Sequence, residues 1–262
     1  MVDDTSWIRR IARRGVVVCL FVAAGCTAAP DLEVSSRFQE AEQKFVQAES
    51  PGDFVSVARQ YQDIIDNGFI SGALFYNQGN AWMRAGERGR AIAAYRQAKR
   101  YRPRDPYLDA NLRNALAGRD VGSGTSIADY IFFWQDSLSF AEKLTLTTCL
   151  LALTLAASLG KWWQRHRVLF RRVSAALAVL SVLLAISTAR DWQRFERTTH
   201  GVVVADESTA RKGNSDNYEP AFTEPLAEGT EFTLLDSRDD WLHVRLGASG
   251  DGWIAARDAV VY

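Results

Sequence analysis

Residues 72–105 read GALFYNQGNAWMRAGERGRAIAAYRQAKRYRPRD, and this stretch is the most informative about the fold of the first half of the chain. Its residue types return in the neighbouring sequence. At a spacing of 34 residues the same amino acid occurs in these pairs: Leu74 and Leu108, Asn77 and Asn111, Asn80 and Asn114, Ala81 and Ala115, and, looking backward, Tyr95 and Tyr61. A period of this length is typical of stacked helix pairs, because each pair buries its apolar face against the next. The spacing therefore predicts a helical repeat.

The central unit resembles the tetratricopeptide (TPR) family. The residues at that family's signature positions are Phe75, Gly79, Trp82, Ala91, Tyr95, Ala98 and Pro103. Small residues are expected where the two helices of a repeat approach closely, and aromatic residues where they fill the space between helices. Gly86 and Gly89 are expected to permit the turn, and Pro103 to end the second helix.

The flanking sequence extends this unit into a short solenoid. Residues 38–71 resemble a divergent first repeat, in which Phe45 stands where a small residue is usual. Residues 106–117 supply one further helix, which would cap the stack. The expectation is a TPR-like region over residues 38–117 that buries little surface on its own.

Amide side chains mark the candidate binding groove of this region. The predicted peptide-binding residues are Asn77, Asn80, Arg84, Asn111 and Asn114. Amides can bond to a peptide backbone or a terminal carboxylate, and the arginine adds charge. In peptide-clamping TPR modules a Lys often stands where this chain has Tyr76. The alternative is that the Asn residues cap or bridge adjacent repeats.

Two uncharged runs predict membrane-spanning helices at residues 144–160 and 173–189. The segment between them, 161–172, contains five basic residues and no acidic one. A short loop with such a charge belongs on the cytoplasmic side, so both flanking domains are expected on the other side. Before the first run, residues 118–143 are expected to form a Gly/Ser-rich linker followed by an aromatic juxtamembrane segment. The alternative is that the aromatic segment forms a short helix packed on the repeats.

The N-terminus has the pattern of an export signal over residues 1–26. Arginines precede an apolar run at 15–25, which is too short to span a bilayer. The run ends in Val-Ala-Ala-Gly-Cys, which resembles a bacterial lipobox and predicts lipidation at Cys26. The alternative is an ordinary signal peptide cleaved nearby. Both alternatives export the rest of the chain.

The last 63 residues, 200–262, change to a period of two and predict a small β-barrel. The candidate strands are 201–205, 230–235, 241–246, 253–255 and 260–262. The order of a Val-rich strand, a basic stretch, a Glu-Gly turn, an Asp-Trp-Leu-x-Val hairpin and a Gly-Trp-Ile strand resembles bacterial SH3-like domains. Tyr218, Phe222 and Trp241 are the candidate aromatic groove. The alternative for Trp241, and for Trp253, is a place in the barrel core.

Charge and motif content exclude several function classes. The chain has 31 basic and 31 acidic residues, which argues against a nucleic-acid partner. The three histidines and three cysteines show no metal-ligand spacing, and there is no phosphate-binding glycine loop or nucleophile elbow. We therefore expect no metal, no cofactor and no enzymatic activity.

The predicted architecture is multidomain: an all-α TPR solenoid, two transmembrane helices and a small all-β SH3-like barrel. This order resembles the TPR protein of the Bat (Bacteroides aerotolerance) group, whose members accompany membrane proteins with von Willebrand factor A-type domains and a MoxR-type ATPase. The resemblance implies a scaffold in the bacterial inner membrane, with both domains on the periplasmic side. The alternative is a cell-wall tether, in which the barrel binds peptidoglycan and the repeats recruit a wall enzyme.

Overall fold

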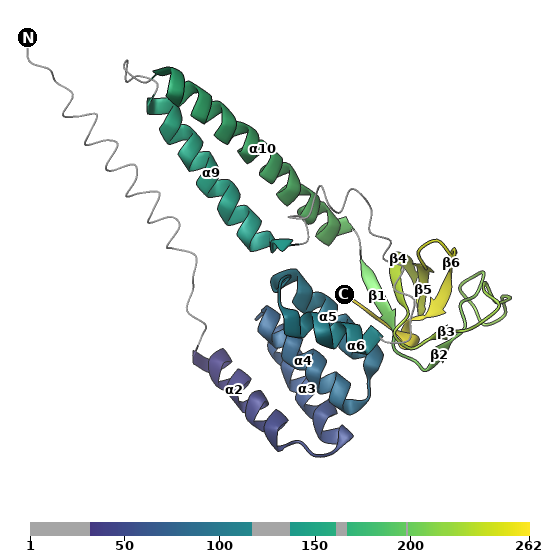
Figure 1. Ribbon diagram of the computed structural model, residues 1–262. Helices are drawn as coiled ribbons and strands as arrows, with labels where there is room; N and C mark the ends of the chain where they lie inside the picture. The colour runs from purple at the N-terminus through teal and green to yellow at the C-terminus, as the bar shows by residue number, and fades with distance from the viewer. Residues whose placement is uncertain (1–31, 117–136, 161–166, 198) are drawn as a thin grey trace, which may run out of the picture. The chain divides into compact units, whose positions relative to one another are not determined.

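The computed structural model describes residues 32–116, 137–160, 167–197 and 199–262 (Figure 1). The predicted signal with Cys26, most of the predicted linker and the first half of the predicted basic loop lie outside these residues. The described residues fall into two compact units. Ala141–Thr188 belong to one, and Glu33–Phe140 with Ala189–Tyr262 form the other.

The second unit begins with a helical region that covers the predicted repeats. Its helices are α2 (Leu32–Gln47), α3 (Pro51–Asp66), α4 (Gly72–Ala85), α5 (Arg88–Tyr101) and α6 (Pro106–Leu116). The predicted central unit therefore corresponds to the pair α4 and α5, and the predicted single helix after it corresponds to α6. The first helix begins earlier than the expected start at residue 38.

Local sequence signals set the ends of these helices. Ser50 and Asp53 form a capping box before α3, in which the Ser50 hydroxyl accepts from the Asp53 N–H and the Asp53 carboxylate accepts from the Ser50 N–H. Gly86 ends α4 with a φ of 88°, which an L side chain adopts only under strain. Helix α5 ends at Tyr101, just ahead of Pro103.

Helices α4 and α5 approach each other closely at Gly79. A Cβ atom at this position would lie 2.5 Å from the ring of Tyr95, so any larger residue would push the two helices apart. Tyr95 is 1% exposed and joins α5 to its neighbours. The small residue and the aromatic residue thus have the roles that the sequence predicts for them.

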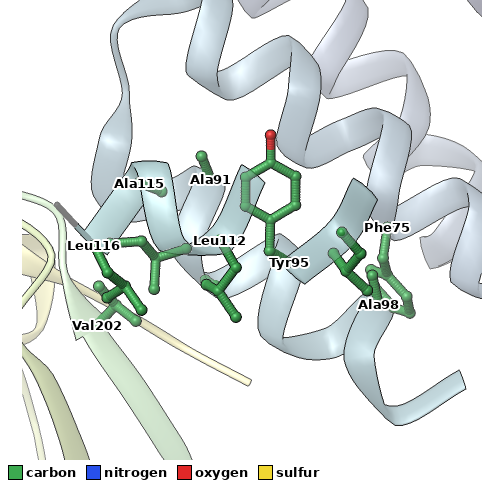
Figure 2. Close-up of a cluster of buried hydrophobic side chains, with 11 residues drawn as sticks. Phe75, Ala91, Tyr95, Ala98, Leu112, Ala115, Leu116 and Val202 are labelled. Atoms are coloured by element: carbon green, nitrogen blue, oxygen red, sulfur yellow. The ribbon is translucent and has the colours of Figure 1, made fainter. Parts of the chain in front are cut away.

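Two apolar clusters hold the helical region together. The first lies between α2, α3 and α4 and contains Tyr61, Leu74 and Ala81. In place of the small residue usual there, Phe45 packs edge-on against Phe54, with ring centroids 5.5 Å apart. The second cluster lies between α4, α5 and α6, and Figure 2 shows its side chains.

The chain ends in a β-domain, residues 199–262. Its strands are β1 (His200–Val203), β2 (Glu207–Ser208), β3 (Leu226–Ala227), β4 (Glu231–Arg238), β5 (Trp241–Arg245), β6 (Asp251–Ala255) and β7 (Ala259–Val261). The main antiparallel sheet has the order β6-β5-β4-β1-β7, and β2 pairs with β3. All five predicted strands overlap a strand of the main sheet. The short pair β2 and β3 was not predicted.

The β-domain packs against the helical region through strand β1, which is buried on both faces. Val203 points into the core of the β-domain, whereas Val202 belongs to the second helical cluster, and both are 0% exposed. Figure 2 shows Val202 beside Leu116 at the end of α6. Val260 and Tyr262 of the last strand pack against the same cluster. The β-domain thus packs mainly against α5.

Two long apolar helices, α9 (Phe140–Gly160) and α10 (Arg167–Arg197), lie between these regions in the sequence. Both are long and apolar enough to cross a membrane, over Phe140–Leu159 and Arg167–Gln193. They include and extend the predicted spans. Because α10 begins at Arg167, the second half of the predicted basic loop is helical.

Small hydroxyl residues face one another between α9 and α10. The side-chain oxygens of Thr147 and Thr188 lie 3.4 Å apart, and so do those of Thr154 and Ser181. Each helix contributes its two residues at a spacing of seven, which places them on one face. Large apolar side chains are exposed around this seam; they include Leu144, Leu151, Leu155, Val179, Leu183 and Ile186.

Candidate functional site

The predicted groove residues Asn80 and Asn111 form a hydrogen-bond network inside the helical region. The Asn80 carbonyl oxygen accepts from the Tyr95 hydroxyl and from the Asn111 amide, each at 2.9 Å. The same Asn111 amide donates to the Tyr76 hydroxyl at 3.2 Å. These contacts join α4, α5 and α6. Burial of the Tyr95 ring and its proximity to Tyr76 raise the pKa of the Tyr95 phenol.

Asn77, also on α4, makes a comparable contact with an earlier helix. Its amide donates to the Glu42 carboxylate of α2 at 3.2 Å. The neighbouring Tyr61 is buried, and burial together with the Glu42 charge raises the pKa of its phenol to about 12. The structure therefore brings three of the four predicted Asn residues into contacts between neighbouring helices.

The other two predicted groove residues are exposed. Asn114 lies on the outer surface of α6. Arg84, on α4, places its guanidinium carbon 5.9 Å from the centre of the Phe54 ring. A ligand in the predicted groove would therefore find these two side chains accessible, whereas Asn77, Asn80 and Asn111 already bond within the protein.

A hollow of about 380 Å³ lies on a different face of the helical region. Its lining comes from three helices, the α4–α5 turn and the last strand: Val55, Arg59, Gln62, Gln78, Trp82, Glu87, Arg90, Ala93, Ala94, Gln97 and Val260. On α4, Gln78 and Trp82 are four residues apart and share the face toward the hollow. The predicted groove residues Asn77 and Arg84 lie seven apart on another face.

A buried amide forms part of the wall of this hollow. Gln78 is 3% exposed, and its Nε2 donates to the Gln62 carbonyl at 2.7 Å and to the Ala58 backbone oxygen at 3.5 Å. The rest of the buried face of α4 consists of apolar and glycine residues, such as Leu74 and Ala81. A buried amide must be hydrogen-bonded, and Gln78 meets this need on the side of the hollow.

The remaining walls combine aromatic and charged groups. The Arg90 guanidinium lies over the Trp82 ring, 5.3 Å from its centre, and its Nε is 3.3 Å from a Glu87 carboxylate oxygen. Arg59 and Gln97 stand at the hollow as well, and Ala93 and Ala94 form an apolar floor. Sequence reasoning missed this site. The one available signal was the polar Gln78 within an otherwise apolar helix face.

Two polar contacts fix the β-domain onto α5. Arg96 forms a two-point ion pair with Glu231, with N···O distances of 2.6 and 2.7 Å. Burial opposes the charge of Arg96, but the hydrogen bond and charge of Glu231 outweigh it and raise the pKa of the guanidinium. The Gly89 N–H donates to Glu228 at 2.6 Å. Both contacts lie within one compact unit.

The predicted aromatic groove of the β-domain is spread over three places. Tyr218 is 51% exposed and its ring lies against Gly213. Phe222 borders the β-domain core, and Trp241 is half-buried on β5. Among the described residues, no ring-to-ring contact joins these three side chains.

Trp253 occupies the buried position that the sequence allows for it. It is 9% exposed and stacks on His243, with ring centroids 4.8 Å apart. The Arg238 guanidinium covers the ring at 5.3 Å, and His243 bonds to Asp251 at 2.7 Å. This arrangement builds one side of the β-sheet.

In the part of the chain that the structure describes, no three His, Cys, Asp or Glu side chains gather so that they could hold a metal ion. Cys149, the described cysteine, is exposed on α9. No protein-family model, no curated protein and no solved structure matches this chain.

Proposed function

We propose that this chain is a membrane-anchored scaffold without catalytic activity. In this proposal a TPR-type helical stack and an SH3-like β-domain act as one rigid binding body on the periplasmic side of a bacterial inner membrane. The observation that carries the proposal is the packing of the β-domain on the helical region, through Val202 and the Arg96–Glu231 ion pair.

This packing constrains the topology. The helical region precedes α9 and the β-domain follows α10, yet the two contact each other directly. Two domains in contact must lie on the same side of a membrane. If α9 and α10 insert, they therefore do so as a hairpin. This reasoning supports the two-span topology without using the charges of the connecting segment.

The surfaces of α9 and α10 favour insertion. Large apolar side chains are exposed on both helices, which suits lipid and not water. The hydroxyl side chains Thr147, Thr154, Ser181 and Thr188 instead face one another, as is usual between packed membrane helices. The basic start of α10, with Arg167, Arg171 and Arg172, favours a cytoplasmic position for the turn.

The resemblance to the Bat group suggests the partners of this scaffold: membrane proteins with von Willebrand factor A-type domains. Such partners would share the membrane with α9 and α10 and meet the helical region outside it. A second candidate is a cell-wall tether, favoured by the exposed Tyr218 on the long loop of the β-domain. In that case the β-domain would bind peptidoglycan.

Reporter fusions test the topology on which the proposal stands. Alkaline phosphatase, which is active only outside the cytoplasm, and green fluorescent protein, which fluoresces only inside, are fused after Leu116, Arg172 and Tyr262. We expect phosphatase activity at the first and last positions and fluorescence at the middle one. Fluorescence after Tyr262 would exclude the hairpin and with it a periplasmic scaffold.

A further inference from the structure

The hollow on the helical region is a composite cavity. Its walls come from α3, α4 and α5, and Val260 of strand β7 closes one side. Neither the helices nor the β-domain alone would complete it. Its volume of about 380 Å³ falls in the lower part of the range found for small-molecule sites, and suits one or two side chains of a peptide.

The polar groups around this cavity are not all used within the protein. Glu87 is the acidic residue of the lining, and it already pairs with Arg90. Within the described residues, the side chain of Arg59 makes no ion pair or hydrogen bond, and the same holds for the side chain of Gln97. The cavity therefore presents one uncompensated positive charge and a free amide above an apolar floor.

We infer that this cavity binds a peptide segment in which a carboxylate follows or precedes an apolar side chain. Arg59 would bond to the carboxylate and Gln97 to the peptide backbone, while the apolar side chain would rest on Trp82 and the two alanines beside it. The inference rests on the proposed scaffold function and gives that scaffold a partner site. The carboxylate comes either from an Asp or Glu side chain or from a C-terminus.

This site differs from the predicted groove in what its polar groups are free to do. In the groove, Asn77, Asn80 and Asn111 are bonded to neighbouring helices, so a ligand would have to displace internal contacts. At the cavity, Arg59 is available on the surface of α3 without any rearrangement. A ligand gains most where the protein is already arranged to receive it.

The test uses the full chain in lipid nanodiscs and two bead-bound libraries of random octapeptides, one with free C-termini and one with C-terminal carboxamides. We expect enrichment of peptides that combine a carboxylate with a neighbouring apolar residue. Enrichment in the carboxamide library assigns the carboxylate to Asp or Glu, and enrichment only in the free-acid library assigns it to the C-terminus. No enrichment over empty nanodiscs would overturn the inference.

Matched arginine variants locate the site. Arg59→Ala should weaken binding of the enriched peptides by about tenfold or more, as the loss of a charged hydrogen bond would. Arg113→Ala removes the same charge from an exposed position on α6, outside both the cavity and the predicted groove, and should leave binding unchanged. Both variants should keep the wild-type circular dichroism and melting temperature, because both side chains are exposed.

A variant of the predicted groove tests the competing site. If Arg84→Ala abolishes binding and Arg59→Ala does not, the ligand occupies the predicted groove and the cavity inference is wrong. That result would leave the scaffold proposal intact, because its own test is the topology of the fusions. Failure of the two ideas is thus distinguishable.

Discussion

Arg96 of α5 and Glu231 of β4 face each other in a two-point ion pair, although 135 positions separate them in the sequence. Both side chains are about two-thirds buried, with 33% and 29% exposed. The planar guanidinium matches the two carboxylate oxygens, a geometry that adds direction as well as attraction. The pair fixes the orientation of the β-domain on the helical stack.

The first prediction concerns the strength of this pair. Arg96→Ala and Glu231→Ala should each destabilise the protein, and a double-mutant cycle should give a coupling of about 1–2 kcal/mol. The measurement is urea unfolding of the full chain in nanodiscs. The pair Arg238 and Asp236 serves as the control because it is largely exposed. The coupling of this control pair should stay below about 0.5 kcal/mol. If the two ion pairs had equal couplings, the domain interface would not be formed in solution.

The second prediction compares two glycines at the same helix position. Gly89 is the second residue of α5, and a Cβ there would lie 2.4 Å from the Val203 carbonyl oxygen. Gly89→Ala should therefore force the β-domain away and cost about 1–3 kcal/mol. Gly52 is the second residue of α3, where a Cβ meets only the Ser50 hydroxyl at 3.8 Å.

Gly52→Ala is the control for that change. Alanine favours the helix, so this variant should unfold at an equal or higher urea concentration than wild type. Limited proteolysis of the Gly89→Ala protein should also release the β-domain faster. Equal stability of the two variants would show that α5 and β1 do not approach as closely as the structure has them.

The third prediction separates structural amides from accessible ones. Asn80→Ala removes the acceptor of both Tyr95 and Asn111, and should destabilise the helical region by about 1–3 kcal/mol. Asn114→Ala changes an exposed residue and should stay within about 0.5 kcal/mol of wild type. Thermal unfolding followed by circular dichroism measures both. If Asn80→Ala leaves the thermal stability unchanged, the Asn80 side chain is not needed for these internal contacts and is free to bind a ligand in the predicted groove.

The sequence predicted the elements of this fold better than their assembly. The 34-residue spacing located α4, α5 and α6, and the close approach of Gly79 to Tyr95 follows from the residue types alone. Alternating apolar residues located the five strands of the main sheet. These signals are short-range in the sequence, because each depends on residues within one strand or on residues no more than one 34-residue period apart.

The domain interface left no comparable signal. Arg96 has the appearance of any charged residue on a helix surface, and its partner lies in another domain. The sequence predicts Gly89 as part of a turn, whereas in the structure Gly89 makes room for the backbone of β1. The sequence around Val202 is compatible with a strand that is buried on one face, and equally with a strand that is buried on both faces. The cavity could not be predicted from the sequence either, because one of its walls belongs to β7, which is distant in the sequence from the helices that form the other walls.

The fourth prediction is a loss of stability in alkaline solution. The folded protein holds the pKa of Tyr61 at about 12, above the ordinary value of 10.0. A raised pKa means that the folded state retains the proton more strongly. The contribution to stability is complete below pH 10 and is lost as the pH rises through 12. Unfolding by urea should therefore become easier between these values, and Tyr61→Phe should make this dependence less steep. An unchanged slope in that variant would assign the effect to other tyrosines.

The fifth prediction tests the hairpin of α9 and α10 in native membranes. The hydroxyl oxygens of Thr147 and Thr188 lie 3.4 Å apart across the two helices, so cysteines at both positions should form a disulfide on mild oxidation. Thr148 is exposed on another face of α9, so cysteines at positions 148 and 188 should not form a disulfide. Both variants carry Cys149→Ala to remove the neighbouring thiol. Efficient bridging at 147 and 188 would mean that the chain turns back on itself in the membrane, which returns the β-domain to the side of the helical region. Equal bridging in both pairs, or bridging only between two copies of the chain, would contradict the antiparallel contact and the topology derived from it.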